Sequence, residues 1–378
     1  MSRQLKTTLL VIMSIALGCG FMHHLIPTEE MNFERLHIFL FNLCSGGTLL
    51  IYFTEDRKRL SKKGRLFFLL SICFALFSFL EWYVPTLIIP LFLATITEKV
   101  RIDHFGSIVP RDLFNIRESV SRKFHQASLL CLSMSLILSS PVILNSVYTH
   151  WFYLEKLKLD TFFLGFSFPL SLISMSVIYS LMQKHEMEFT VHIKETLFWT
   201  INLGVIVFFV FILARWFVPQ VMIATTLFLA VALTLYLYYH QGIQVQQKAF
   251  LTSGILFLLI TSITGIIYIL VAFSDSYDPQ RQLPLLRLHA FTALYGWNLS
   301  GLAVISRHGD FPLRLHSKKT IILHWFTVLV LCPAGYFYAP SAVLAVIFYI
   351  WLLHTLLFNY GPIDLRLVSA EDKVLKTE

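Results

Sequence analysis

Residues 248–273 read KAFLTSGILFLLITSITGIIYILVAF, and this stretch decides the fold class. It holds one charged residue, Lys248, at its first position. A helix of about 20 apolar residues crosses the hydrocarbon core of a bilayer, which is about 30 Å thick. A charge at the centre of that core costs at least a few kcal/mol, so a membrane span excludes charges. The stretch therefore predicts a transmembrane α-helix.

Comparable apolar runs recur along the whole chain. Hydrophobic residues make up 56% of it and charged residues only 14%, whereas soluble domains carry about 25% charged residues. We predict an all-α, polytopic membrane protein with one transmembrane domain over residues 1–378. The twelve predicted spans are 8–26, 34–53, 66–82, 84–98, 126–148, 161–182, 195–214, 218–239, 248–273, 285–306, 318–337 and 341–359.

The basic residues predict the orientation of the chain. With the N-terminus in the cytoplasm, 24 of the 30 Lys and Arg residues fall on the cytoplasmic side, as the positive-inside rule expects. The short stretch 84–98 contains Pro85 and Pro90, and a re-entrant loop is its alternative. Because the basic loops before 66 and after 98 both belong inside, residues 66–98 must cross twice. We therefore predict twelve spans, both termini inside, in a bacterial inner (cytoplasmic) membrane.

Composition and motifs exclude several function classes. The net charge of +8 comes from residues that would face anionic headgroups, so the lipid bilayer is the expected partner and nucleic acid is not. No nucleotide-binding, metalloprotease or nucleophile motif occurs. The five cysteines lie in apolar segments without a CxxC pair, as buried apolar residues do. The start resembles a secretory signal, but we expect it to be kept as an uncleaved first span.

Histidine is the residue type that points to chemistry, because neutral imidazole binds metals and heme iron. The chain has 14 histidines, most of them in predicted loops or at span ends, where solvated surface explains them. For a histidine inside a span, a hydrogen bond between two helices is the alternative role. Those inside or at the edge of spans are His23, His24, His37, His289, His324 and His354.

Two of these histidines stand in matching sequences. The second span opens with RLHIF (35–39) and the tenth with RLHAF (287–291). At about 1.5 Å per residue, both histidines lie about one turn below the outer end of their helices. We therefore predict that the second and tenth spans are neighbours and that His37 and His289 can face each other. The triplet RLH recurs at 314–316 in a predicted cytoplasmic loop, so the triplet alone does not discriminate.

This pattern resembles a known family. Twelve spans with histidines at the outer ends of the second and tenth look like the catalytic subunit of heme-copper oxidases, and HAFTALYGWN (289–298) is similar to the tenth-span motif of the cbb-type enzymes. The resemblance implies a b-type heme with His37 and His289 as axial ligands of the iron. It also implies that Arg35 and Arg287 pair with the heme propionates.

The chain departs from the family at several points. In the cbb-type motif a His-x-His pair precedes Gly-Trp, and Phe291 stands at the place of the second histidine. The sixth and seventh spans, 161–182 and 195–214, contain no histidine, so the copper ligands of the family are missing. Oxygen reduction at a heme-copper centre is therefore not expected. His23 or His24 is the alternative heme ligand.

Three functions stay open at this stage. The first is a membrane b-type heme protein in electron transfer, or in handling or sensing a diatomic gas, with a redox partner or membrane complex subunits. The second is a transporter or permease, although the spans lack the interior carboxylates that proton-coupled transporters usually carry. The third is a scaffold or assembly protein without small-molecule chemistry.

Overall fold

The structure, a computed structural model, describes residues 1–361 apart from 29, 154–156, 158, 184–187, 275–276, 312, 314 and 316. Arg314 and His316 of the third RLH triplet therefore lie outside the described residues, as do several of the charged residues in the orientation argument. These are Lys156, Lys158, Lys184, Arg314, Arg366, Lys373 and Lys376. The described part of the chain is helical and forms no strand, which confirms the all-α prediction.

The helices follow one another closely along the chain. The first group is α1 (Arg3–Cys19), η1 (Met22–His24), α2 (Phe33–Ile38), η2 (Phe39–Gly47), α3 (Thr48–Thr54), α4 (Lys62–Phe79) and α5 (Tyr83–Phe105). The second is η3 (Arg111–Phe114), α6 (Val120–Leu144), η4 (Asn145–Thr149), α7 (Leu159–Phe163), η5 (Leu164–Ser167), α8 (Phe168–Ser180), α9 (Glu188–Ala214) and α10 (Phe217–Gln241). The third is α11 (Gln247–Ala272), α12 (Pro279–Phe291), η6 (Thr292–Asn298), α13 (Leu299–Ser306), α14 (Lys318–Phe326), η7 (Thr327–Leu331), α15 (Cys332–Phe337) and α16 (Ala339–Phe358).

Each predicted span overlaps one helix or several consecutive helices. The first predicted span, 8–26, extends beyond α1, which ends at Cys19. Among the described residues, eight such segments are long and apolar enough to cross a membrane, so the chain has the features of a multi-pass membrane protein. One of the eight is α5, a single helix over Tyr83–Phe105 in spite of its two prolines. Pro85 lies in the first turn, where the missing N–H needs no partner. The number twelve and the orientation stay predictions.

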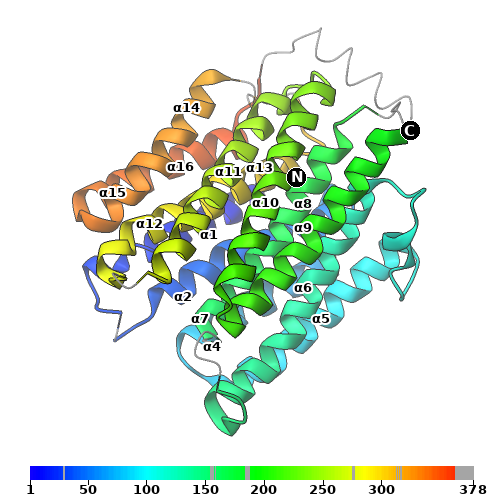
Figure 1. The fold of residues 1–378 in the computed structure, drawn as a ribbon. Helices are drawn as coiled ribbons and strands as arrows, with labels where there is room; N and C mark the ends of the chain where they lie inside the picture. Colours follow the sequence, from blue (N-terminus) through cyan, green and yellow to red (C-terminus); the bar gives the residue numbers. More distant parts are fainter. Residues whose placement is uncertain are drawn as a thin grey trace.

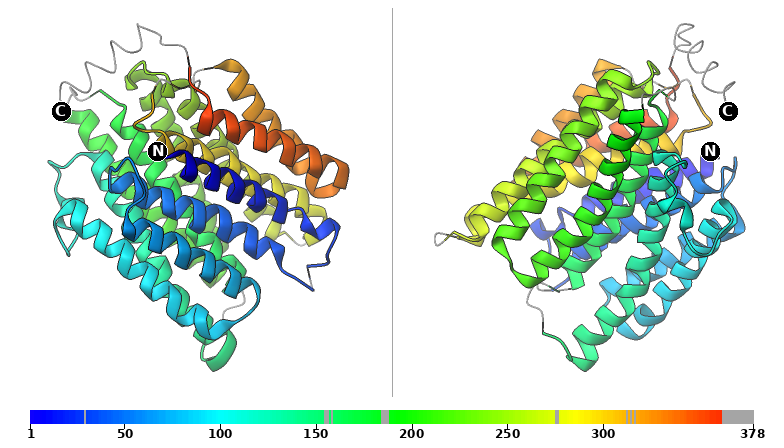
Figure 2. Two further views of the ribbon diagram at one scale, coloured as in Figure 1. Left: turned by 180° about the vertical axis from the view of Figure 1, so that it is seen from behind. Right: turned by 45° about the vertical axis from the view of Figure 1, so that its right-hand side comes forward.

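The helices form a closed bundle, with α4–α6 on one side and α14–α16 on the other (Figure 1). Neighbours in sequence pack against each other at α5–α6 and α10–α11, and α16 closes the bundle by packing against α1. Figure 2 shows α1 between α16 and the rod formed by α2, η2 and α3, which is called the 33–54 rod below. This rod is the most buried of the candidate spans.

Three rods meet at the centre of the bundle. They are the 33–54 rod, α8, and the rod of α12, η6 and α13, called the 279–306 rod below. Two glycines allow the close approach. A Cβ atom on Gly301 would overlap the side chain of Ser174, and one on Gly46 would lie 2.5 Å from Leu170. These two glycines therefore let the central rods approach α8 closely.

The central rods are not regular α-helices. The central 33–54 rod contains the π-helix η2, and the central 279–306 rod contains η6; the outer rod over 318–337 contains η7. In a π-helix the hydrogen bonds run from i to i+5, and such turns are frequent at functional sites. Irregular backbone inside a membrane is tolerated where protein rather than lipid surrounds it, as is the case for η2 and η6.

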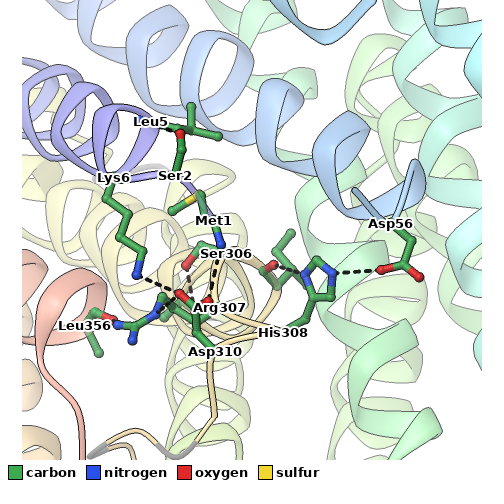
Figure 3. Close-up of polar contacts among 12 residues, drawn as sticks. Met1, Ser2, Leu5, Lys6, Asp56, Ser306, Arg307, His308, Asp310 and Leu356 are labelled. Carbon is green, nitrogen blue, oxygen red and sulfur yellow. Dashed lines mark hydrogen bonds and ion pairs between the residues drawn. The ribbon is translucent and has the colours of Figure 1, made fainter. Parts of the chain in front are cut away.

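Ion pairs fix the end of the bundle at which residues 1–6, 55–61 and 307–311 lie, called the basic end below (Figure 3). Asp310 accepts hydrogen bonds from Lys6 at 2.6 Å and from Nε of Arg307 at 2.9 Å. His308 contacts the carboxylate of Asp56 at 3.1 Å. These contacts tie α1, the loop after α3 and the end of α13 together.

Candidate functional site

The 33–54 and 279–306 rods lie side by side, as the sequence repeat predicts. Glu34 and Arg287 form a bidentate ion pair between them. Deeper in the bundle, the hydroxyl of Tyr295 lies 3.0 Å from Nδ1 of His37. The rings of Phe41 and Tyr295 pack with centroids 4.8 Å apart. The predicted neighbourhood of the two rods is confirmed.

His37 is held against α1. Its Nδ1 lies 2.7 Å from the backbone oxygen of Ala16. A carbonyl oxygen carries no hydrogen, so Nδ1 must be the donor and Nε2 must keep its lone pair. The hydroxyl oxygen of Tyr295 then accepts a share of the same N–H. Gly20 leaves room for the ring, because a Cβ atom there would lie 3.0 Å from Nδ1.

His289 is held in the same way against α11. Its Nδ1 lies 3.0 Å from the backbone oxygen of Thr261 and 3.3 Å from Oγ1 of Thr264. The Thr264 hydroxyl donates its own proton to a carbonyl of the preceding turn, so both contacts require the proton on Nδ1. Gly265 leaves room for the ring, because a Cβ atom there would lie 3.2 Å from Cε1.

The two histidines therefore occupy matching seats. In each seat the preceding transmembrane helix supplies a carbonyl at position i and a glycine at i+4. These are Ala16 and Gly20 for His37. They are Thr261 and Gly265 for His289. Neither Nε2 atom has a hydrogen-bond partner in the described part of the chain. Metal-binding histidines in general fix one nitrogen by donation to a carbonyl or carboxylate and present the other to the metal.

The two arginines of the repeat already have partners. Arg287 pairs with Glu34, and its guanidinium lies over the ring of Tyr336 at 4.3 Å. Arg35 donates to the backbone oxygen of Ser78 at 2.8 Å, and its contact with Glu81 is 3.4 Å. Either arginine would have to divide its N–H donors between these acceptors and a propionate.

His23 and His24 are directed to another helix. Nε2 of His23 donates to the backbone oxygen of Tyr336 at 2.9 Å, and Nε2 of His24 donates to that of Gly335 at 2.8 Å. The last carbonyls of a helix lack intrahelical donors, and side-chain donors commonly satisfy them. In the structure the pair acts as a cap for the end of α15.

Sequence reasoning missed the partners of Tyr295. Its backbone oxygen accepts a hydrogen bond from Nε2 of His324 at 2.6 Å, and its ring packs edge-on against Tyr349 at 5.0 Å. Tyr295 thus links the rods of His37, His324 and Tyr349. The sequence marks His324 as an intramembrane histidine, but the carbonyl that it binds is a backbone atom with no sequence signature.

Each seat offers an oriented imidazole with a free Nε2, the type of nitrogen that binds heme iron. The rings are held against different helices, His37 against α1 and His289 against α11, so the expectation that they face each other stays a prediction. Among the described residues, no group of three or more His, Cys, Asp or Glu side chains is placed to hold a metal ion. A site with two histidines and a porphyrin does not need such a group. Comparisons with protein-family models, with curated proteins and with solved structures found no match.

Proposed function

We propose that the protein is an integral membrane b-type heme protein that transfers electrons, with His37 and His289 as the axial ligands. One observation carries the proposal: two matching seats fix Nδ1 and leave Nε2 free, on two rods in contact. Metal-binding histidines commonly present such a nitrogen to the metal, whereas a role in helix packing alone gives it no partner.

Two imidazole ligands favour electron transfer over gas binding. When bound, heme supplies an iron that changes its oxidation state by one electron. With both axial positions taken by imidazoles, no position is left for a diatomic gas. Arg35 and Arg287 stay the proposed propionate partners, with Glu34 competing for Arg287. A redox partner or the subunits of a membrane complex would supply and accept the electrons.

The topology belongs to the same proposal. The proposed chain has twelve spans in a bacterial cytoplasmic membrane and both termini in the cytoplasm. In this topology the two seats would lie near the outer surface of the membrane. Reporter fusions in 57–65 and in 99–123 should both report cytoplasm, and fusions in 150–160 and 274–284 should report the outer side. Opposite signals at 57–65 and 99–123 would show that 66–98 crosses once, and the twelve-span topology would then be wrong.

A transporter is the second candidate, and one observation favours it. The central rods carry the π-helices η2 and η6, and transporters often place interrupted helices at the substrate site. Against it, Gly46 and Gly301 close the centre by direct contact with α8. The two candidates differ in one simple property, since only the first requires a visible absorption spectrum.

The deciding experiment is the dithionite-reduced spectrum of the protein, purified from cells supplied with heme. The proposal expects sharp α and β bands. His37→Ala or His289→Ala should abolish them or change them to a high-spin spectrum. The matched control is His354→Ala, because His354 lies in α16 on the exposed face, where its ring stacks on Phe358. A featureless spectrum of the parent protein, or an equal loss in the His354 variant, would refute the proposal.

A further inference from the structure

An apolar groove runs between α11 and α14 on the exterior of the bundle. It has a volume of about 600 Å³, and its lining includes Leu256, Ile322, Phe326 and Val330. These four side chains are all exposed, Ile322 by 65%. The indole N–H of Trp325 donates to a hydroxyl of α11 at 2.6 Å and joins the two helices along the groove. A groove of this shape and composition on a membrane protein fits an acyl chain.

The mouth of the groove at the basic end carries positive charge. Lys318 and Lys319 are the first two residues of α14, and both are exposed. The hydrogen bond from Trp325 to Ser253 fixes the relative depth of the two helices, which run in the same direction. It places Lys248, the second residue of α11, level with these two lysines. The ammonium group of Lys248 donates to the backbone oxygen of Gly242 at 2.8 Å, so the two exposed lysines of α14 supply the charge at the mouth of the groove.

The start of α14 adds to this charge. Its N-cap residue, Ser317, makes no side-chain hydrogen bond to the first turn. The first N–H groups of a helix point outward, carry part of the positive end of the helix dipole, and bind phosphates well. The uncapped turn, the lysines and the apolar groove are separate features, and all three match one ligand: an anionic head joined to a hydrocarbon tail.

The chain contains a natural comparison for this site. The helix α4 also begins with two lysines, Lys62 and Lys63, at the same end of the bundle. There the N-cap Ser61 accepts a hydrogen bond from the N–H of Gly64, and Lys63 pairs with Asp103. The first turn of α4 is thus capped, and one of its lysines is already paired. We therefore expect this lysine pair to bind a phosphate more weakly than the pair on α14.

We propose that this groove binds one anionic phospholipid from the leaflet at the basic end, which the charge bias predicts to be the cytoplasmic leaflet. The phosphate lies against Lys318, Lys319 and the first turn of α14, and one acyl chain lies along Ile322 and Phe326. The site is independent of the histidine seats, because its residues lie on the outer faces of α11 and α14. Basic pockets between transmembrane helices on the cytoplasmic side are typical sites for anionic lipid headgroups.

The test uses the full-length protein, delipidated in detergent and mixed with equal amounts of phosphatidylglycerol and phosphatidylcholine. Native mass spectrometry should show one phosphatidylglycerol retained in preference to phosphatidylcholine. Lys318→Ala with Lys319→Ala should weaken this retention about 25-fold, since each lysine near an anionic headgroup contributes about fivefold. The control pair Lys62→Ala with Lys63→Ala should retain the lipid as the parent does.

A second variant separates the groove from the charge. Ala249 lines the groove, so Ala249→Trp should fill it and reduce retention while all lysines stay in place. Glycerol phosphate, which has the head without the chains, should not compete with the bound lipid. Equal loss in the two lysine pairs, no preference for phosphatidylglycerol, or full retention by Ala249→Trp would each overturn the proposal. Melting temperatures of the lipid-free variants show that they remain folded.

Discussion

The seats of His37 and His289 differ in what surrounds them. Both rings donate from Nδ1 to the carbonyl of the preceding helix, beside a glycine one turn further on. His37 is 7% exposed and has a second rod behind it, because Tyr295 contacts the same nitrogen. His289 is half-buried, and its extra contact, Thr264, comes from the helix that already holds it. Each seat is therefore formed by the helix that carries the histidine and the helix before it. In addition, the 279–306 rod closes the seat of His37, and no third helix closes that of His289 in the described part of the chain.

The largest expected difference follows from removing each ring. In heme-free protein, His37→Ala should lower the free energy of unfolding by about 2–4 kcal/mol, because it leaves a cavity and removes the hydrogen bond to the Ala16 carbonyl in a closed site. His289→Ala should cost less, about 1–2 kcal/mol, because its half-buried surroundings can adjust. Unfolding in mixed micelles measures both, with His354→Ala as the control. A larger loss at His289 would reverse the comparison.

The glycines beside the rings give the next effect. Gly20 has a helical φ of −63°, so Gly20→Ala acts through space alone: the new methyl group would lie 3.0 Å from Nδ1 of His37. We expect a loss of about 1–2 kcal/mol, as for overpacked cores. The methyl group of Gly265→Ala would lie 3.2 Å from the ring of His289, so the loss of stability should be smaller.

A matched control lies on the same helix as the first glycine. A Cβ atom on Gly18 would have no atom within 4 Å, so Gly18→Ala should leave stability unchanged or raise it slightly. Equal losses for Gly18→Ala and Gly20→Ala in a thermal melt would mean that helix α1 resists any added side chain. The steric account of the seat would then be wrong.

The sequence predicts the seats in part. Hydropathy predicts the helices, because an apolar span in lipid must hydrogen-bond its own backbone N–H and C=O groups, as an α-helix does. The matching RLHIF and RLHAF segments predict that the two rods are neighbours, and the ion pair of Glu34 with Arg287 agrees. The partners of the rings could not be predicted, because they are backbone carbonyls of Ala16 and Thr261. The π-helices also lack a sequence signal, since they depend on packing at the centre.

The hydroxyl of Tyr295 should have a smaller effect, confined to one seat. Tyr295→Phe removes the oxygen that shares the N–H of His37, and such contacts in membrane proteins average about 0.6 kcal/mol. A double-mutant cycle with His37→Ala should show a coupling energy of this size. The cycle with His289→Ala should show none, because Tyr295 does not contact that ring. Coupling to both histidines would show that the seats act as one unit.

The smallest effect concerns the basic end, where Asp310 ties α1 to the same rod that carries His289. Burial alone would raise the pKa of Asp310, but the hydrogen bond from Lys6 and the charge of the N-terminal ammonium group outweigh it and lower the pKa. A carboxyl whose pKa is lower in the folded state stabilises the fold above its ordinary pKa of about 4. This stabilisation is lost as the pH falls below that value and through the lower folded-state pKa.

Asp310→Asn should therefore lower the melting temperature slightly at pH 7 and flatten its decline between about pH 5 and pH 3. The partly exposed Asp278, at the start of α12, supplies the control, and Asp278→Asn should keep the decline of the parent. The effect is small because an ion pair near the surface contributes about 1 kcal/mol or less. If Asp310→Asn declines as steeply as the parent, the carboxylate does not hold α1 against the 279–306 rod. The junction of the two rods would then depend on the His37 seat and the Glu34–Arg287 pair at the other end.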